Sequence, residues 1–225
     1  MKKGFLSIAV ALVLVMGMAG LSFGGVIDWA NWTTTSGPDT VDGAGASYTV
    51  SYNGELNFAQ INNTGTIYYY TDPSHFPVGA PYTSTTVSNL PPTSDIIAIV
   101  GDGTTHTITF TGPVTNPVMA IVSLGQPSLH TSYNFDQPFT ILSDGPGWWG
   151  SPGTLLNPSG NVLQGIEGDG TIQFIGTYST ITWTGSNGEV WNGFTVGVPV
   201  PVPPTALLLG SGLLGLGLLR FRRKA

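Results

Sequence analysis

Apolar and polar residues alternate with a period of two in much of the middle of the chain, where four segments of alternating or continuous apolar residues each enclose a turn dipeptide. The segments are YTVSYNGELNFAQI, IIAIVGDGTTHTITF, VLQGIEGDGTIQFIG and ITWTGSNGEVWNGFTV. Their dipeptides are Asn53-Gly54, Asp102-Gly103, Asp169-Gly170 and Asn187-Gly188. Asn-Gly and Asp-Gly suit tight turns that require positive φ angles. The pattern therefore predicts four β-hairpins, and with them at least eight strands.

The same period predicts which side chains face the interior. Between Thr105 and Phe110, the side chains of His106, Ile108 and Phe110 share one face of a strand and three threonines share the other. Ile181 and Trp183 are expected to face the core in the same way, with threonines pointing to water. Trp191 also follows polar residues and is predicted to be a core residue.

Helices are not expected in this middle part, because no segment carries a sustained apolar repeat of 3.6 residues. The chain contains 32 Gly and 17 Pro, which would interrupt helices throughout. The predicted fold is all-β, an antiparallel β-sandwich of jelly-roll-like type that covers residues 25–197.

Charge is separated along the chain in an unusual way. The six basic residues lie at its two ends: Lys2, Lys3, Arg220, Arg222, Arg223 and Lys224. The twelve acidic residues lie between Asp28 and Glu189, so the region between the ends has a formal charge of 0 − 12 = −12. A body without cations cannot neutralise phosphates, which excludes nucleic acid as a partner. The absence of Cys excludes disulfides and thiol chemistry.

The N-terminus has the three parts of a secretory signal peptide. Lys2 and Lys3 precede an apolar run at 5–18, and small residues follow up to Gly25. We expect residues 1–24 to be removed during export across the inner membrane. The alternative is a retained N-terminal membrane helix, for which the run is short.

The C-terminus, residues 198–225, has a proline-rich segment, an apolar run and a basic end. The 15-residue run at 205–219 would measure about 22 Å as a helix, shorter than the hydrocarbon core of about 30 Å. A membrane helix at about 204–221 is predicted, and the positive-inside rule would keep Arg220, Arg222, Arg223 and Lys224 in the cytoplasm. The body would then lie outside the membrane.

This order of parts resembles the C-terminal sorting signal of PEP-CTERM proteins. The proline-rich motif comprises Val198, Pro199, Val200, Pro201, Val202, Pro203 and Pro204. Valine stands where the family's motif has glutamate. The resemblance implies recognition by a membrane-embedded exosortase-like enzyme that cleaves near the motif, which would place the protein at the cell surface or outside the cell. The segments FDQPFTILSDGPGWWG and WNGFTVGV are similar to bodies that carry such tails, and imply no known activity.

Two tryptophans are the candidate ligand-binding residues. Trp148 and Trp149 lie in SDGPGWWGSPG, a segment too rich in Gly and Pro for a strand. Exposed aromatic rings in such a loop stack on sugar rings, which makes extracellular polysaccharide a candidate partner. The alternative is that the pair covers one end of the core.

Calcium is the candidate metal. Asp39 and Asp42 in PDTVDGAG, and Glu167 and Asp169 in EGDG, offer oxygen ligands close together in predicted loops. Neither segment matches an EF-hand loop. The alternative is ordinary turn chemistry, for which Asp and Gly are favoured in any case.

Catalytic motifs are missing from the sequence of the body. It contains no G-x-S-x-G, no P-loop and no H-E-x-x-H, and its three histidines do not have the spacing of metal ligands. A carboxylate-based hydrolase would use Glu55, Glu167 and Glu189. We favour the interpretation that Glu55 and Glu189 are solvated beside turns. The sequence therefore predicts a surface protein without catalytic activity and without a cofactor, and a glycan-binding module is the alternative.

Overall fold

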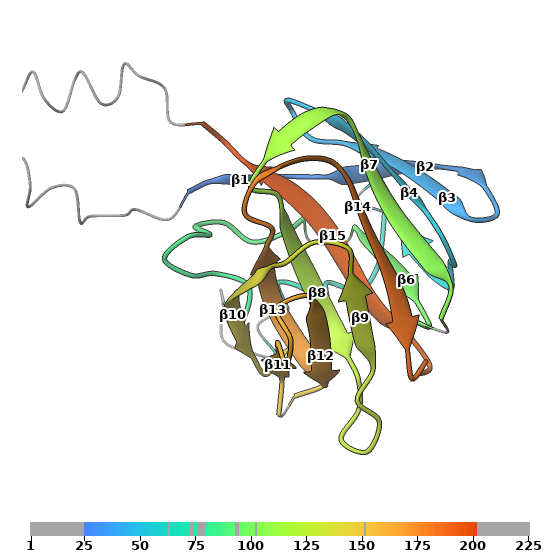
Figure 1. The fold of residues 1–225 in the computed structure, drawn as a ribbon, viewed down its shortest axis with the longest axis vertical. Helices are drawn as coiled ribbons and strands as arrows, with labels where there is room; N and C mark the ends of the chain where they lie inside the picture. Colours follow the sequence, from blue (N-terminus) through green and yellow to red (C-terminus); the bar gives the residue numbers. More distant parts are fainter. Residues whose placement is uncertain are drawn as a thin grey trace, which may run out of the picture.

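The protein is an all-β structure of two antiparallel sheets, as the alternating pattern predicts (Figure 1). The computed structural model describes residues 25–201, apart from residues 63, 73, 76–79, 93–94, 102 and 151. The β-sandwich prediction is confirmed at this level. The predicted signal peptide at 1–24, the helix at 204–221 and the basic end lie outside the described residues. Within the described part of the chain, no helix is long and apolar enough to cross a membrane.

The first sheet has seven strands in the order β10-β13-β8-β15-β6-β5, and β1 also pairs with β15. Its strands are β1 (Ile27–Trp29), β5 (Phe58–Gln60), β6 (Ile96–Ile99), β8 (Val118–Leu124), β10 (Thr140–Gly145), β13 (Gly168–Gln173) and β15 (Asn192–Pro199). The second sheet has eight strands in the order β11-β12-β9-β14-β7-β4-β3-β2. Its strands are β2 (Asn31–Gly37), β3 (Thr40–Ala44), β4 (Thr49–Asn53), β7 (Thr105–Thr115), β9 (Ser132–Phe135), β11 (Thr154–Leu156), β12 (Val162–Ile166) and β14 (Thr177–Ser186).

The main core lies between the two sheets. The second sheet contributes Ile108, Phe135 and Trp183, and these belong to the same buried cluster as Ile121 and Phe194 of the first sheet. The predicted facing is confirmed for both segments, because His106, Ile108 and Phe110 are buried whereas Thr105 and Thr109 are exposed. Ile181 and Trp183 are buried, and the threonines beside them are exposed or half-buried. The outer face of the second sheet is thus uncharged and rich in threonine along these strands.

A second core covers the outer face of the first sheet. The long connection between β5 and β6 contributes Tyr69, Tyr70, Tyr82 and Val87, which form one buried cluster with residues of β6 and β8. The first sheet is therefore buried on both faces. This explains why every residue of β6 and of β8 is buried, and why their sequences read as continuous apolar runs rather than as alternation.

The four predicted hairpins are wrong, because the chain changes sheet at or near each turn dipeptide. Asn53-Gly54 leads from β4 in the second sheet to β5 in the first, and Asn187-Gly188 leads from β14 to β15. Gly103 lies between β6 and β7, which also belong to different sheets; Asp102 is outside the described residues. Asp169-Gly170 lies inside β13, and the change of sheet occurs at Glu167. A turn dipeptide determines that the chain bends, but the pairing partner is determined by which apolar faces are buried together.

Both ends of the described chain leave the sandwich at the same place. β1 pairs with the end of β15, with Ile27 opposite Pro199, and the Val200 amide donates to the Val26 carbonyl at 2.8 Å (Figure 1). Val198 and Pro199 of the proline-rich segment are thus part of β15. The folded body extends past the boundary expected at residue 197.

Candidate functional site

A pocket of about 290 Å³ lies at the end of the sandwich where β8 ends and β15 begins. Its lining comprises Ser123, Gln126, Trp149, Glu167, Glu189, Val190 and Trp191. The antiparallel register brings these segments together, because Gly168 at the start of β13 pairs with Leu124, and Gly193 near the start of β15 pairs with Val122. The pocket is therefore built where the end of β8, an inner strand of the first sheet, meets the links that precede β13 and β15 and the link that follows β10.

Glu189 is a buried carboxylate in this pocket, not the solvated turn residue expected from the sequence. Its side chain is 8% exposed, and Oε1 accepts hydrogen bonds from the Gly125 amide at 2.7 Å and from Asn192 Nδ2 at 2.9 Å. Burial raises the pKa of Glu189 to about 7, the hydrogen bonds act in the opposite direction, and the charge of Glu167 adds to the increase. The expectation was wrong because the link from β14 to β15 passes from one sheet to the other beside the end of β8 instead of closing a hairpin.

Glu167 reaches the same pocket from the link between β12 and β13. Its backbone has a φ of 49°, and Ser123, whose hydroxyl donates to Glu167 Oε2 at 3.0 Å, has a φ of 54°. The left-handed region costs a residue other than glycine about 1–2 kcal/mol. Ser123 lies at the irregularity where the pairing of β8 with β13 shifts register, and Glu167 directly precedes β13. Strained residues of this kind occur at functional sites as well as at bulges.

The aromatic side of the pocket is formed by Trp149 and Trp191. Trp149 is 56% exposed, and its ring centroid lies 6.5 Å from that of Trp191. Trp191 is half-buried, and its ring packs edge-to-face on Phe58 at 5.3 Å and on Tyr69 at 5.1 Å. Trp191 was expected in the core; it packs, partly buried, against the second core and also lines the pocket. The arrangement offers an exposed indole ring beside a second one that is held rigidly.

Trp148 has a different environment from its neighbour. Its ring stacks on the His75 imidazole with centroids 3.8 Å apart, and Tyr69 contacts it edge-to-face at 5.2 Å. His75 Nδ1 donates to the Trp148 carbonyl at 2.9 Å. The alternative proposed for the pair, covering one end of a core, therefore describes Trp148, whereas the exposed ring of Trp149 is free to meet a ligand.

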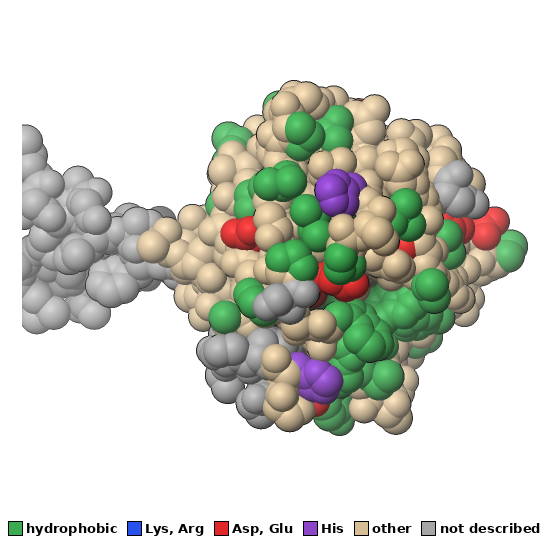
Figure 2. Space-filling view, turned by 90° about the horizontal axis from the view of Figure 1, so that it is seen from below, with side chains coloured by type: hydrophobic (Ala, Val, Ile, Leu, Met, Phe, Trp, Pro, Cys, Tyr) green, Lys and Arg blue, Asp and Glu red, His purple; other side chains and the backbone are tan. Residues whose placement is uncertain are grey.

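Acidic and apolar side chains meet on the side of the molecule where the pocket lies. Figure 2 views the sandwich from below, the side toward which β8 ends and from which β15 starts in Figure 1. It shows apolar side chains gathered into one continuous area with acidic side chains beside it, and no Lys or Arg among the described residues. The exposed apolar side chains that line the pocket are Trp149 and Val190, and Val190 is 74% exposed. The face combines apolar contact area with negative charge.

Asp169 lies behind the pocket and is completely buried. Its Oδ1 accepts hydrogen bonds from the Tyr82 hydroxyl at 2.9 Å and from the Ser123 amide at 3.0 Å. Its Oδ2 is buried without a hydrogen-bond partner among the described residues, with Gly147 packed against the carboxylate. Burial raises the pKa of Asp169 to about 7. Ser123 thus connects two acidic groups: its amide bonds to Asp169 and its hydroxyl to Glu167.

The four calcium candidates fall into two separate pairs. Asp39 lies in the exposed turn between β2 and β3 and Asp42 on β3 of the second sheet, whereas Glu167 and Asp169 adjoin the first sheet. Across the described ranges, no group of three or more His, Cys, Asp or Glu side chains could hold a metal ion. Calcium at either pair stays a prediction from the sequence.

Glu55, the third candidate for carboxylate chemistry, is separate from the pocket. Oε1 accepts a hydrogen bond from the Val100 amide at 2.7 Å and Oε2 one from the Gly101 amide at 3.1 Å. Both oxygens thus stabilise the link that follows β6. His106 is also structural: it is buried, and its Nδ1 lies 2.8 Å from the Tyr52 hydroxyl.

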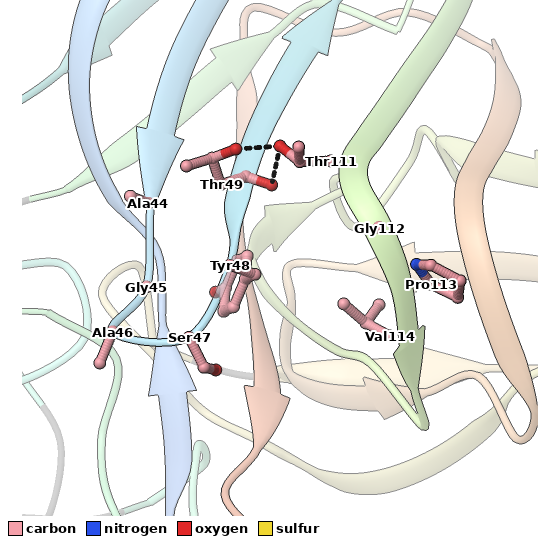
Figure 3. Close-up of a pocket in the computed structure, with 10 residues that line it drawn as sticks. All are labelled: Ala44, Gly45, Ala46, Ser47, Tyr48, Thr49, Thr111, Gly112, Pro113 and Val114. Atoms are coloured by element: carbon pink, nitrogen blue, oxygen red, sulfur yellow. Dashed lines mark hydrogen bonds between the residues drawn. The ribbon is translucent and has the colours of Figure 1, made fainter.

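A larger depression, of about 550 Å³, lies between the β3–β4 loop and β7 (Figure 3). Figure 3 shows small or neutral side chains along it, including a hydrogen bond between the hydroxyls of Thr49 and Thr111. Tyr48 donates its hydroxyl to the Asp28 carbonyl at 2.9 Å. No carboxylate lines this depression. We therefore place the candidate site in the smaller pocket, which has both charge and exposed aromatic surface.

Comparison with known proteins adds little to this geometry. No family model and no curated protein matches the chain. A solved structure of a peptidoglycan O-acetylesterase is similar over 79% of this chain, with 13% sequence identity and a TM-score of 0.35. The match covers 35% of that protein, so the chain spans about a third of its length. A likeness at this TM-score carries no argument about activity, and the site must be interpreted from its own residues.

Proposed function

We propose that the protein is an exported, cell-surface β-sandwich without catalytic activity, and that it binds a glycan in the pocket of Trp149, Trp191, Glu167 and Glu189. The observation that carries the proposal is the exposed Trp149 ring beside two carboxylates in one depression. Aromatic faces bind the apolar faces of sugar rings, and carboxylates accept hydrogen bonds from sugar hydroxyls. A volume of about 290 Å³ is at the small end for ligand pockets, which suits a short saccharide unit.

The finer architecture that we propose is a jelly roll. The strands β6-β15-β8-β13 of one sheet face β7-β14-β9-β12 of the other. In chain order, the chain changes sheet between successive members of this set except from β9 to β12, which pair within the second sheet. Such alternation is the connectivity of two interlocked Greek keys. It gathers the loops between the sheets at the ends of the sandwich, where the pocket lies.

Export and anchoring are proposed from the two ends of the chain. The signal peptide at 1–24 and the tail at 198–225 would place the body outside the membrane, with release by an exosortase-like enzyme as the next step. The position of the pocket supports this arrangement. β15 runs from the pocket to the chain exit over 8 residues, about 26 Å at the usual rise of a strand. A body held by its tail would therefore present the pocket away from the membrane.

Glycoside hydrolysis is the second candidate function, favoured by one observation. Glu189 and Glu167 line the same pocket, and burial raises the pKa of Glu189 to about 7. A carboxyl group that holds its proton near neutral pH is suited to act as general acid, with Glu167 as the base or nucleophile. Release of reducing ends from a bound oligosaccharide, abolished by Glu189→Gln, would establish this function in place of binding alone.

The binding proposal is tested with a glycan array and then by titration calorimetry on the best ligand. The full chain is used in micelles of a detergent whose headgroup is not a sugar. Trp149→Ala is expected to lower the affinity about tenfold, because it removes the exposed ring from the pocket. Ile175→Ala is the control, since Ile175 is 59% exposed and follows the far end of β13. An array without hits, or equal affinity after Trp149→Ala, would contradict the proposal.

A further inference from the structure

The two carboxylates of the pocket have only neutral partners. Glu189 accepts from a backbone amide and from Asn192, and Glu167 accepts from Ser123. No Lys or Arg occurs between residues 4 and 219, and none of the three histidines is among the residues that line the pocket. Two acidic groups therefore share a depression with no positive charge of the protein to balance them. Keeping both carboxyl groups ionised in this depression costs free energy, which a cation on the ligand would offset.

We infer that the saccharide bound in this pocket carries a protonated amine, as a hexosamine without its N-acetyl group does. This inference rests on the proposed glycan binding and names its ligand class. An ammonium group has three donors and no acceptor, which matches a site that presents carboxylate oxygens. Hydrogen bonds between an ammonium and a carboxylate are about twice as strong as those between neutral groups.

The aromatic side of the pocket also suits a cation. Trp149 and Trp191 line the same depression as Glu167 and Glu189, and tryptophan has the ring that attracts cations most strongly. An amino sugar can thus place its ammonium at the carboxylates while the face of its ring lies on an indole. Saccharides with carboxylate or sulfate groups would be repelled by Glu167, by Glu189 and by the formal charge of −12 carried by the body.

A metal ion matches the pocket less well than an organic cation does. Calcium requires six to eight oxygen ligands, and one side of this pocket consists of tryptophan rings and Val190. Within the described residues no metal-holding group of three acidic, histidine or cysteine side chains exists. The cation expected here is therefore part of a larger molecule with an apolar face.

The test compares two oligosaccharides that differ only in the amine. Glucosamine trimer and N-acetylglucosamine trimer are titrated into the full chain by calorimetry at low salt. We expect glucosamine trimer to bind at least tenfold more tightly than N-acetylglucosamine trimer. Added NaCl should weaken the binding of glucosamine trimer and leave that of the N-acetylated trimer unchanged. Equal affinity for both trimers would overturn the inference and leave glycan binding intact. If neither trimer binds while the array shows another glycan, the inference of an amine is likewise overturned and glycan binding stands. An array without any hit would overturn both proposals.

A pair of variants then locates the charge effect. Glu167→Gln is expected to lower the affinity for glucosamine trimer about tenfold and to leave the affinity for the N-acetylated trimer unchanged. Asp39→Asn is the matched control, because it removes the same charge from an exposed turn of the other sheet. Equal losses in the two variants would mean that only the overall charge attracts the amine, and would overturn the assignment to this pocket. The comparison of the two trimers does not depend on either variant.

Discussion

At the scale of single residues, Asp169 shows most clearly how the structure changes the role that a sequence suggests. Asp169-Gly170 has the composition of a turn, but Asp169 is a strand residue with 0% exposure. The Tyr82 hydroxyl and the Ser123 amide donate hydrogen bonds to Oδ1 of Asp169, and Oδ2 has no hydrogen-bond partner among the described residues. A carboxyl group in such surroundings is more stable with its proton than without it.

The stability of the protein is therefore expected to fall as the pH rises. Asp169 and Glu189 both have a pKa of about 7 in the folded protein, whereas Asp and Glu in an unfolded chain have pKa values of about 4. Between these values the folded state holds protons that the unfolded state has lost. The contribution of these two groups to the free energy of unfolding is then highest at about pH 4 and below, and it is lost as the pH rises from 4 through 7. Urea unfolding at pH 5 and pH 8 measures the difference.

Asp169→Asn identifies the contribution of Asp169 to this dependence. Asparagine keeps an oxygen that accepts from Tyr82 and Ser123, but it does not titrate. The decrease in the free energy of unfolding should become smaller, by up to about 1.4 kcal/mol per pH unit over the affected interval. A variant with the original pH dependence would show that Asp169 is ionised without cost in the folded protein.

At the scale of elements, β12 and the end of β8 approach each other too closely for side chains. A Cβ atom at Gly165 would lie 2.0 Å from the Leu124 carbonyl oxygen, and one at Gly125 would lie 2.1 Å from the Gly165 carbonyl oxygen. Gly125 also has a φ of 77°. This contact fixes the Gly125 amide that donates to Glu189, so the packing of two sheets positions a carboxylate of the pocket.

Gly165→Ala is expected to lower the free energy of unfolding by about 1–3 kcal/mol, because the backbone of β8 must move to admit a methyl group. The matched variant is Gly112→Ala on β7, where a Cβ atom would meet nothing within 4 Å. That change should be neutral or stabilise by up to about 1 kcal/mol. Thermal and urea unfolding of both variants measures the effects. Similar values for the two would contradict the close contact between β8 and β12.

At the scale of the whole molecule, the folded body includes the start of the predicted sorting motif. Val198 and Pro199 belong to β15, and Val200 is hydrogen-bonded to Val26. Cleavage before Val200 would require the end of this strand to separate from β1. A processing enzyme that acts on the folded body would therefore cut on the C-terminal side of Val200.

The intact mass of the mature protein from cells tests both predicted processing events. We expect a chain that begins at Gly25 and ends between Pro201 and Pro204. A mass that still includes Arg223 would show that the tail is a permanent anchor. A mass that includes Lys2 and Lys3 would show that the N-terminal segment is retained as a membrane helix.

The sequence by itself determined that strands form around Ile108 and Trp183, which faces of these strands are buried, and the charge of the body. The alternation around Ile108 and Trp183 is a local property, since neighbouring side chains of a strand point to opposite faces whatever the partner strand is. The absence of basic residues from the body is likewise a matter of composition alone.

Only the tertiary structure decided which strands pair and which acidic residues meet. Turn dipeptides such as Asn187-Gly188 indicate a bend, but the next strand joins whichever sheet buries its apolar residues, and this depends on distant segments. Glu167 and Glu189 are 22 positions apart in the sequence. They share a pocket because β13 and β15 both pair antiparallel with β8 and begin beside its end, an arrangement set by long-range packing.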